Sequence, residues 1–181
     1  YHPYPALDAK GYAEKIDKLL NLYDWEIQQT QLNLLSSHDI ARALSVAGED
    51  ITSMALATLL LLTFPGAPSI YYGDEVGLPG RLDPDCRRGF PEPDQWNKDL
   101  LQMHKDLIAL RHAHPALRTG KYQTLAAEGE CYVFARILEK EMVVVAVNMG
   151  TESVQVRLAD MAVESGEVLY GEGKVEWVGD R

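Results

Sequence analysis

The first half of the chain alternates between strand-like and helix-like segments, and this order constrains the fold more than any other feature. Segments 31–35 and 69–72 are short and apolar, and we expect each of them to form a buried strand. Between them, residues 51–64 predict a buried helix with Asp50 as its N-cap. The run Pro-Gly-Ala-Pro at 65–68 ends that helix, because proline cannot continue it. The order strand, helix, strand is typical of a parallel sheet or barrel.

Two amphipathic segments, residues 12–23 and 99–113, predict further helices by their apolar spacing. An irregular stretch with four prolines and three glycines covers residues 76–97. Loops of this length are usually functional or disordered.

The character of the sequence changes near Thr119. Residues 131–138 and 142–148 are β-rich and predict a hairpin, and the alternation at 154–158 predicts a half-exposed strand. Residues 168–170 and 175–178 suggest additional strands. We therefore expect a βα part at 1–119 and a small antiparallel β domain at 120–181.

The charge and cysteine content exclude several classes of protein. The net charge is −10, which argues against nucleic-acid binding and against docking on anionic membranes. The apolar run 54–64 is too short to span a bilayer, which takes about 20 residues. Cys86 and Cys131 form no metal-ligand spacing, which favours ordinary thiols in a reducing, cytoplasmic compartment. The sequence predicts no cofactor and assigns no metal site.

Polar residues follow both predicted parallel strands. Ser36-Ser37-His38-Asp39 comes after the first strand, and Gly73-Asp74-Glu75 comes after the second. Neighbouring strand ends converge on one face of a (β/α) barrel, where the active site is built. Carboxylates that converge in a cleft are the groups that glycosidic cleavage requires.

Each of these residues can also be interpreted without a catalytic role. Asp39 precedes a helical run, and aspartate is a preferred N-cap. In this non-catalytic interpretation His38 is an ordinary loop residue, and Asp74 and Glu75 are solvated. Asp83 and Arg87 would then form a surface ion pair of little consequence.

Three stretches resemble the α-amylase family of glycoside hydrolases. Residues 32–42, Leu-Asn-Leu-Leu-Ser-Ser-His-Asp-Ile-Ala-Arg, are similar to the family motif at the end of the seventh barrel strand. Residues 65–77 resemble the eighth-strand segment, and residues 83–88 resemble the loop that follows it. The sequences of these stretches are most similar to the branch of neopullulanase, cyclomaltodextrinase and maltogenic amylase. The resemblance implies strands 7 and 8 of a (β/α)8 TIM barrel, followed by a C-terminal β-sandwich.

The resemblance also implies roles for individual residues. Asp39 matches the third catalytic carboxylate, which stabilises the transition state by bonding sugar hydroxyls, and His38 matches a histidine that contacts the same sugar. Asp83 and Arg87 match a pair that binds the α-glucan further along. Two more residues match positions near the cleft and complete the substrate-binding set: Glu75 and Tyr72. Arg42 is expected to be structural, and Trp96 departs from the family pattern.

The family's nucleophile and acid/base match no segment of this chain. We therefore expect the 181 residues to be a C-terminal fragment of an α-glucan hydrolase, inactive alone. Two barrel strands leave open edges, so we expect association with the missing N-terminal barrel half or with a second copy of the chain. The alternatives are a non-catalytic carbohydrate-binding module and a structural module derived from the same fold.

Overall fold

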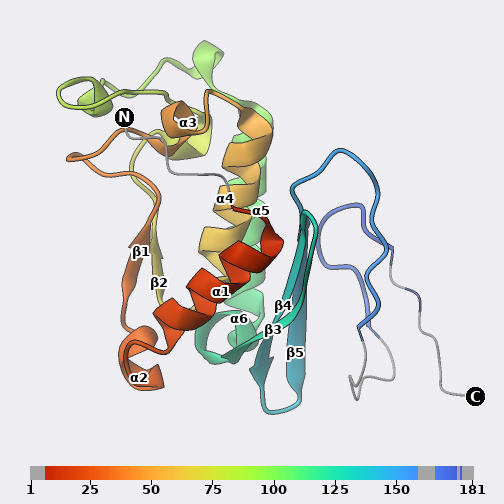
Figure 1. Ribbon diagram of the computed structural model, residues 1–181. Coiled ribbons are helices and arrows are strands. Elements are labelled where there is room, and N and C mark those ends of the chain that lie inside the picture. Colours follow the sequence, from red (N-terminus) through yellow and green to blue (C-terminus); the bar gives the residue numbers. More distant parts are fainter. Residues whose placement is uncertain (1–6, 159–165, 175, 177–181) are drawn as a thin grey trace, which may run out of the picture.

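The computed structural model describes residues 7–158, 166–174 and 176. A layer of helices lies between a two-stranded sheet and a three-stranded sheet (Figure 1). No helix in this part of the chain is long and apolar enough to cross a membrane.

The two-stranded sheet is parallel, as the alternation of strand and helix predicts. Strand β1 (Leu32–Leu34) pairs with β2 (Ala67–Ser69), and helix α4 (Ile51–Thr63) lies between them in the chain. The prediction that these strands are buried is wrong for both. Leu32 and Leu34 of β1 are 65% and 41% exposed, and no residue of β2 is buried. Among the described residues β1 has a neighbour on one side only, which leaves its other edge open.

Strand β2 begins earlier in the chain than expected. It covers Ala67–Ser69 instead of residues 69–72, because pairing with β1 fixes its extent. The ladder begins where the Ala67 amide donates to the carbonyl oxygen of Gln31, at 2.8 Å.

The helices follow local capping signals. Asp50 accepts hydrogen bonds from the amides of Thr52 and Ser53 at the start of α4, which confirms its predicted role. Helix α1 is Ala9–Leu20, shifted from the expected 12–23 because Asp8 caps it. The remaining helices are α2 (Trp25–Gln28), α3 (Ala43–Val46), α5 (Lys98–Ala113) and α6 (Pro115–Thr119).

The second sheet is antiparallel, in the order β3 (Lys121–Glu128), β4 (Cys131–Leu138), β5 (Glu141–Asn148). The predicted hairpin is confirmed as β4–β5. The strands expected at 154–158 and 168–170 do not form, and 175–178 lies outside the described residues except for Glu176.

The core lies between the helices and the three-stranded sheet. Ala9 and Ala13 of α1 and Leu117 of α6 pack there against Tyr132 and Phe134 of β4. This packing joins the βα part to the β part of the chain.

Candidate functional site

His38 and Asp39 lie in the loop between β1 and α3, exposed to solvent. His38 Nε2 is 3.3 Å from Asp39 Oδ2, and the side chains are 65% and 76% exposed. Asp39 does not cap a helix, because α3 begins at Ala43 with Arg42 at its N-cap position. The capping alternative is therefore wrong, and the Asp39 carboxylate is free of any backbone-capping role.

A hydrogen bond ties this loop to the irregular segment after β2. The thiol of Cys86 donates to the carbonyl oxygen of His38 at 3.3 Å. Cys86 is fully buried, and it lies in the short 3-10 turn Asp85–Arg87. The contact holds the His38 loop beside the turn that carries Arg87.

Asp83 and Arg87 form an ion pair through Asp83 Oδ1 and Arg87 Nη2, and both side chains are about half exposed. The hydrogen bond that Arg87 donates to Asp83, together with the charge of Asp83, raises the pKa of Arg87, and the charge of Asp39 contributes in the same direction. The side chains of His38, Asp39, Asp83 and Arg87 are exposed or half exposed, and the bond from Cys86 to His38 brings the two segments that carry them together.

Tyr72 bonds the segment that follows Arg87. Its hydroxyl donates to the carbonyl oxygen of Arg88 at 2.7 Å, and its ring is partly exposed. The side chain thus links the end of β2 to the same irregular segment.

Asp74 is not solvated, which corrects one of the alternatives. It is 4% exposed, and its Oδ1 lies 3.1 Å from Arg42 Nη1. Burial raises the pKa of its carboxyl group, opposed by the hydrogen bond from Ser36 and by the charge of Arg42. Its neighbour Glu75 is partly buried, and Glu75 Oε2 has no hydrogen-bond partner among the described residues.

Arg42 was expected to be structural, but sequence reasoning did not identify its contacts. Its side chain is fully buried, with the guanidinium carbon 4.6 Å and 4.7 Å from the ring centres of Tyr71 and Tyr72. The available signal is its setting in the apolar run Ile40-Ala41-Arg42-Ala43-Leu44, where an arginine is expected to be covered.

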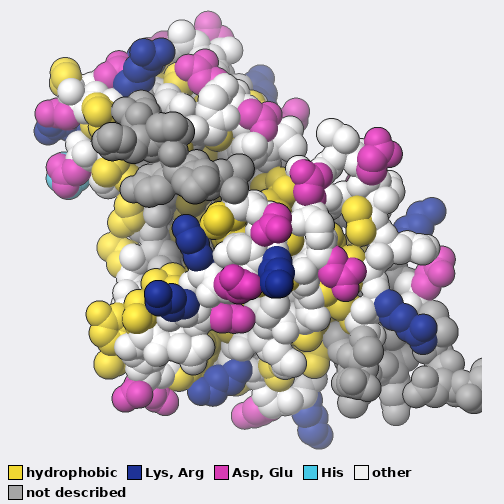
Figure 2. Space-filling view, viewed as in Figure 1, with side chains coloured by type: hydrophobic (Ala, Val, Ile, Leu, Met, Phe, Trp, Pro, Cys, Tyr) yellow, Lys and Arg dark blue, Asp and Glu magenta, His cyan; other side chains and the backbone are white. Residues whose placement is uncertain are grey.

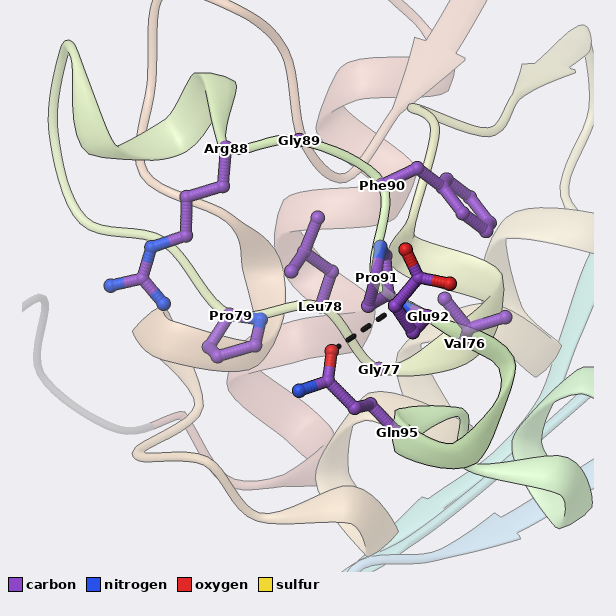
Figure 3. A pocket seen from close by; sticks show the side chains of 10 residues that line it. All are labelled: Val76, Gly77, Leu78, Pro79, Arg88, Gly89, Phe90, Pro91, Glu92 and Gln95. Carbon is purple, nitrogen blue, oxygen red and sulfur yellow. Dashed lines mark hydrogen bonds between the residues drawn. The ribbon is translucent and has the colours of Figure 1, made fainter.

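A separate hollow lies beside the site. It has a volume of ≈ 480 Å³ and is lined by residues of 76–79 and 88–95 (Figure 3). Gln95 Oε1 accepts a hydrogen bond from the amide of Glu92 on its wall. Trp96 packs edge-on against Phe90 and donates to the Pro91 carbonyl, so its indole N–H is already bonded within the loop. None of the predicted site residues lines this hollow, and the chemistry favours the His38–Asp39 surface instead.

No group of three or more His, Cys, Asp and Glu side chains that could hold a metal ion is present in the part of the chain that the structure describes.

Known families match both parts of the chain. Residues 6–88 match the family model "Alpha amylase, catalytic domain", and residues 120–180 match "Alpha-amylase C-terminal domain". The chain belongs to the α-amylase family of glycoside hydrolases.

Individual relatives agree with this assignment. A cyclomaltodextrinase of Geobacillus thermopakistaniensis is 38% identical over 83% of this chain, and neopullulanase 2 of Thermoactinomyces vulgaris is 37% identical over 81%. The crystal structure of a debranching enzyme from Nostoc punctiforme is similar with a TM-score of 0.92, at 55% identity over 99% of this chain. This chain spans 26% of each of the two relatives and 37% of the Nostoc protein.

Proposed function

We propose that this chain supplies part of the substrate-binding face of a hydrolase that acts on α-glucans or maltooligosaccharides. The observation that carries the proposal is the hydrogen bond from Cys86 to the His38 carbonyl oxygen, which holds the loop of His38 and Asp39 beside the turn that carries Arg87. Exposed carboxylate, imidazole and guanidinium groups on one surface suit the many hydroxyl groups of a sugar chain. The names of the relatives, which include a cyclomaltodextrinase and a neopullulanase, support this substrate class.

In this proposal Asp39 accepts hydrogen bonds from ring hydroxyls of the sugar at the point of cleavage. Such bonds accelerate the reaction when they strengthen as the oxocarbenium-like transition state forms. His38 contacts the same sugar, and the forked guanidinium of Arg87 with Asp83 binds a neighbouring unit. Tyr72 and Glu75 border the same region, with Glu75 set deeper because it is partly buried.

Asp39 neither attacks the sugar nor donates the proton in this proposal. A retaining mechanism uses a nucleophile and an acid/base with carboxyl groups about 5 Å apart. No sequence motif of this chain resembles either group, so the proposed role of these residues is binding and transition-state stabilisation.

The same surface also suits a carbohydrate-binding module without catalysis, because all four of its central side chains are exposed or half exposed. Sugar binding without any contribution to turnover in a longer enzyme that contains these residues would favour that function.

An apolar face along β1 supports the proposed partner. Hydrophobic side chains gather at the edge of the molecule where β1 and α2 lie (Figure 2). The exposed ones in this region are Leu19, Leu22, Tyr23, Ile27, Leu32 and Leu34. We propose that this face packs against further strands and helices of an α-amylase barrel, with a second copy of the chain as the alternative. Light scattering on the purified chain tests this proposal. A monodisperse monomer at high concentration would contradict it, because a large exposed apolar face is expected to associate.

The buried thiols of Cys86 and Cys131 support a reducing, cytoplasmic location, and cell fractionation tests it.

Calorimetric titration of the chain with maltotriose tests the proposed function. We expect binding to weaken in Asp39→Asn and in Arg87→Met. The exposed residues Asp94 and Arg81 provide matched controls, because Asp94→Asn and Arg81→Met make the same chemical changes outside the site. Equal affinity in all five proteins, or no binding by the unmodified chain, would contradict the proposal.

A further inference from the structure

Arg42 is a buried cation at the junction of the three segments that carry the candidate site. Its side chain is 0% exposed, and it lies three residues after Asp39. Burial of a guanidinium is costly unless its charge and its donors are matched. An arginine at this position therefore has to be explained by what it contacts.

The guanidinium binds the segment that follows β2. Nη1 donates to the carbonyl oxygen of Tyr72 at 2.7 Å and lies 3.1 Å from Asp74 Oδ1. The rings of Tyr71 and Tyr72 flank it within cation–π range. A planar, delocalised cation suits this setting, and the compact ammonium of lysine does not.

The same residue also contacts the segment that leads to Asp83 and Arg87. The Arg42 amide donates to the carbonyl oxygen of Gly80 at 2.9 Å. A Cβ atom at Gly80 would lie 3.1 Å from Arg42 Cδ and 2.7 Å from the Asp85 carbonyl oxygen. Gly80 therefore fits closely between the stem of Arg42 and the turn that carries Arg87.

The backbone on either side of Arg42 is fixed as well. The Ala43 amide donates to Ser36 Oγ at 2.8 Å. The loop that carries His38 and Asp39 is therefore held at both of its ends. Arg42 Nε and Nη2 are buried without hydrogen-bond partners among the described residues. The number of hydrogen bonds that the guanidinium makes therefore does not explain why an arginine is buried here.

We propose that Arg42 is a positioning residue, which sets the geometry of His38–Asp39 relative to Asp83–Arg87 by bonding Tyr72, Asp74 and Gly80 together. This inference rests on the proposed function, because it concerns the alignment of the proposed sugar-binding groups. Arg42 does not touch the sugar itself.

Arg42→Lys tests the proposal, with Arg111→Lys as a matched control. Arg111 is also a buried arginine, bonded to carbonyl groups away from the candidate site. Both variants are compared under conditions where they are fully folded. We expect Arg42→Lys to weaken maltotriose binding about ten-fold, since small displacements of aligned groups have large effects. Arg111→Lys should stay within about two-fold of the unmodified chain.

Two further readouts separate positioning from general stability. In an Asp39→Asn background, Arg42→Lys should cause a smaller further loss of affinity than it causes alone, because part of its effect acts through the alignment of Asp39. The NMR resonances of the His38 imidazole should move in Arg42→Lys and not in Arg111→Lys. If Arg42→Lys does not fold, Asp74→Asn replaces it, since it removes the charged partner and keeps the shape.

The outcomes distinguish this inference from the proposed function. An unmodified chain that binds no maltotriose contradicts the proposed function, and the His38 resonances then still decide the role of Arg42. A folded Arg42→Lys protein with unchanged affinity and unchanged His38 resonances overturns the inference. Equal effects of Arg42→Lys and Arg111→Lys also overturn it, since they would show a stabilising role alone.

Discussion

Arg111 of α5 and Arg136 of β4 both donate a hydrogen bond to the carbonyl oxygen of Leu117, each at 2.8 Å. Their other acceptors are the carbonyl oxygens of Leu62, Thr63, Phe64, Gly66 and Gly120. Burial lowers the pKa of Arg136 to about 10, so the side chain remains a cation at neutral pH. Two cations bonded only to carbonyl groups thus join the end of α4, the start of β2, helix α6 and the second sheet.

We predict that Arg136→Met destabilises the chain strongly. The change leaves the buried carbonyl oxygens of Thr63 and Gly120 without this donor, and unsatisfied buried acceptors are costly. The free energy of unfolding should fall by about 3 kcal/mol in urea denaturation. Arg118→Met, at an exposed position of α6, is the control and should change it little. Similar values for the two variants would contradict the role of the arginine pair.

Gly66→Ala should lower the free energy of unfolding by more than the strain of its backbone conformation alone explains. Gly66 has φ +99°, and an added Cβ would lie 2.6 Å from Asn33 Nδ2 and 2.6 Å from the Gln31 carbonyl oxygen. We expect a loss of about 3 kcal/mol, which combines backbone strain with displacement of β1. Gly48→Ala isolates the strain, because Gly48 also has positive φ and no atom lies within 4 Å of its Cβ position. The prediction fails if the two variants unfold at the same urea concentration.

The N-cap of α4 should make stability depend on pH. Hydrogen bonds from Ser53 lower the pKa of Asp50 below its ordinary value of 3.8. The stability that this carboxylate contributes is therefore present above pH 3.8 and is lost as the pH falls through the lowered pKa. Asp50→Ala should lower the thermal midpoint at neutral pH, and the difference from the unmodified chain should shrink in acid.

Asp50→Asn is the control for this prediction, because asparagine caps helices without titrating in this range. It should keep most of the stability at every pH. A difference between Asp50→Ala and the unmodified chain that is constant down to pH 2 would rule out the proposed contribution of the charge.

Local signals in the sequence were sufficient for some elements and insufficient for others. Asp50 and the prolines at 65 and 68 delimit α4 by short-range chemistry, and the apolar strands flanking Glu139-Lys140 define the hairpin β4–β5. Strand β3 was missed because its side-chain alternation is interrupted by a register shift between Thr124 and Ala126. The burial of a strand depends on its neighbours, which is why the expected burial of β1 and β2 was wrong.

The candidate site shows the same limit. The motif at 36–39 predicted that His38 and Asp39 follow a strand end, and the pair lies in the loop after β1. The hydrogen bond between Cys86 and His38 joins residues 48 positions apart, and no local sequence pattern predicts it. The burial of Arg111 and Arg136 was equally out of reach, because a charged residue is ordinarily expected at the surface.

The chain alone should release no reducing ends from maltotriose or cyclodextrin. Retaining hydrolysis requires a nucleophile and an acid/base, and neither motif is found in its sequence. A reducing-sugar assay on the purified chain measures this directly. Turnover that disappears in Asp39→Asn would contradict the prediction, because it would place complete catalytic machinery on these residues.

The central claim is that His38, Asp39, Asp83 and Arg87 form one sugar-binding surface. The most direct measurement is a map of backbone amide chemical shifts in the chain as maltotriose is added. The account predicts that the shifts concentrate in residues 36–42 and 83–88. Shifts confined to β3–β5, or none at saturating sugar, would contradict it.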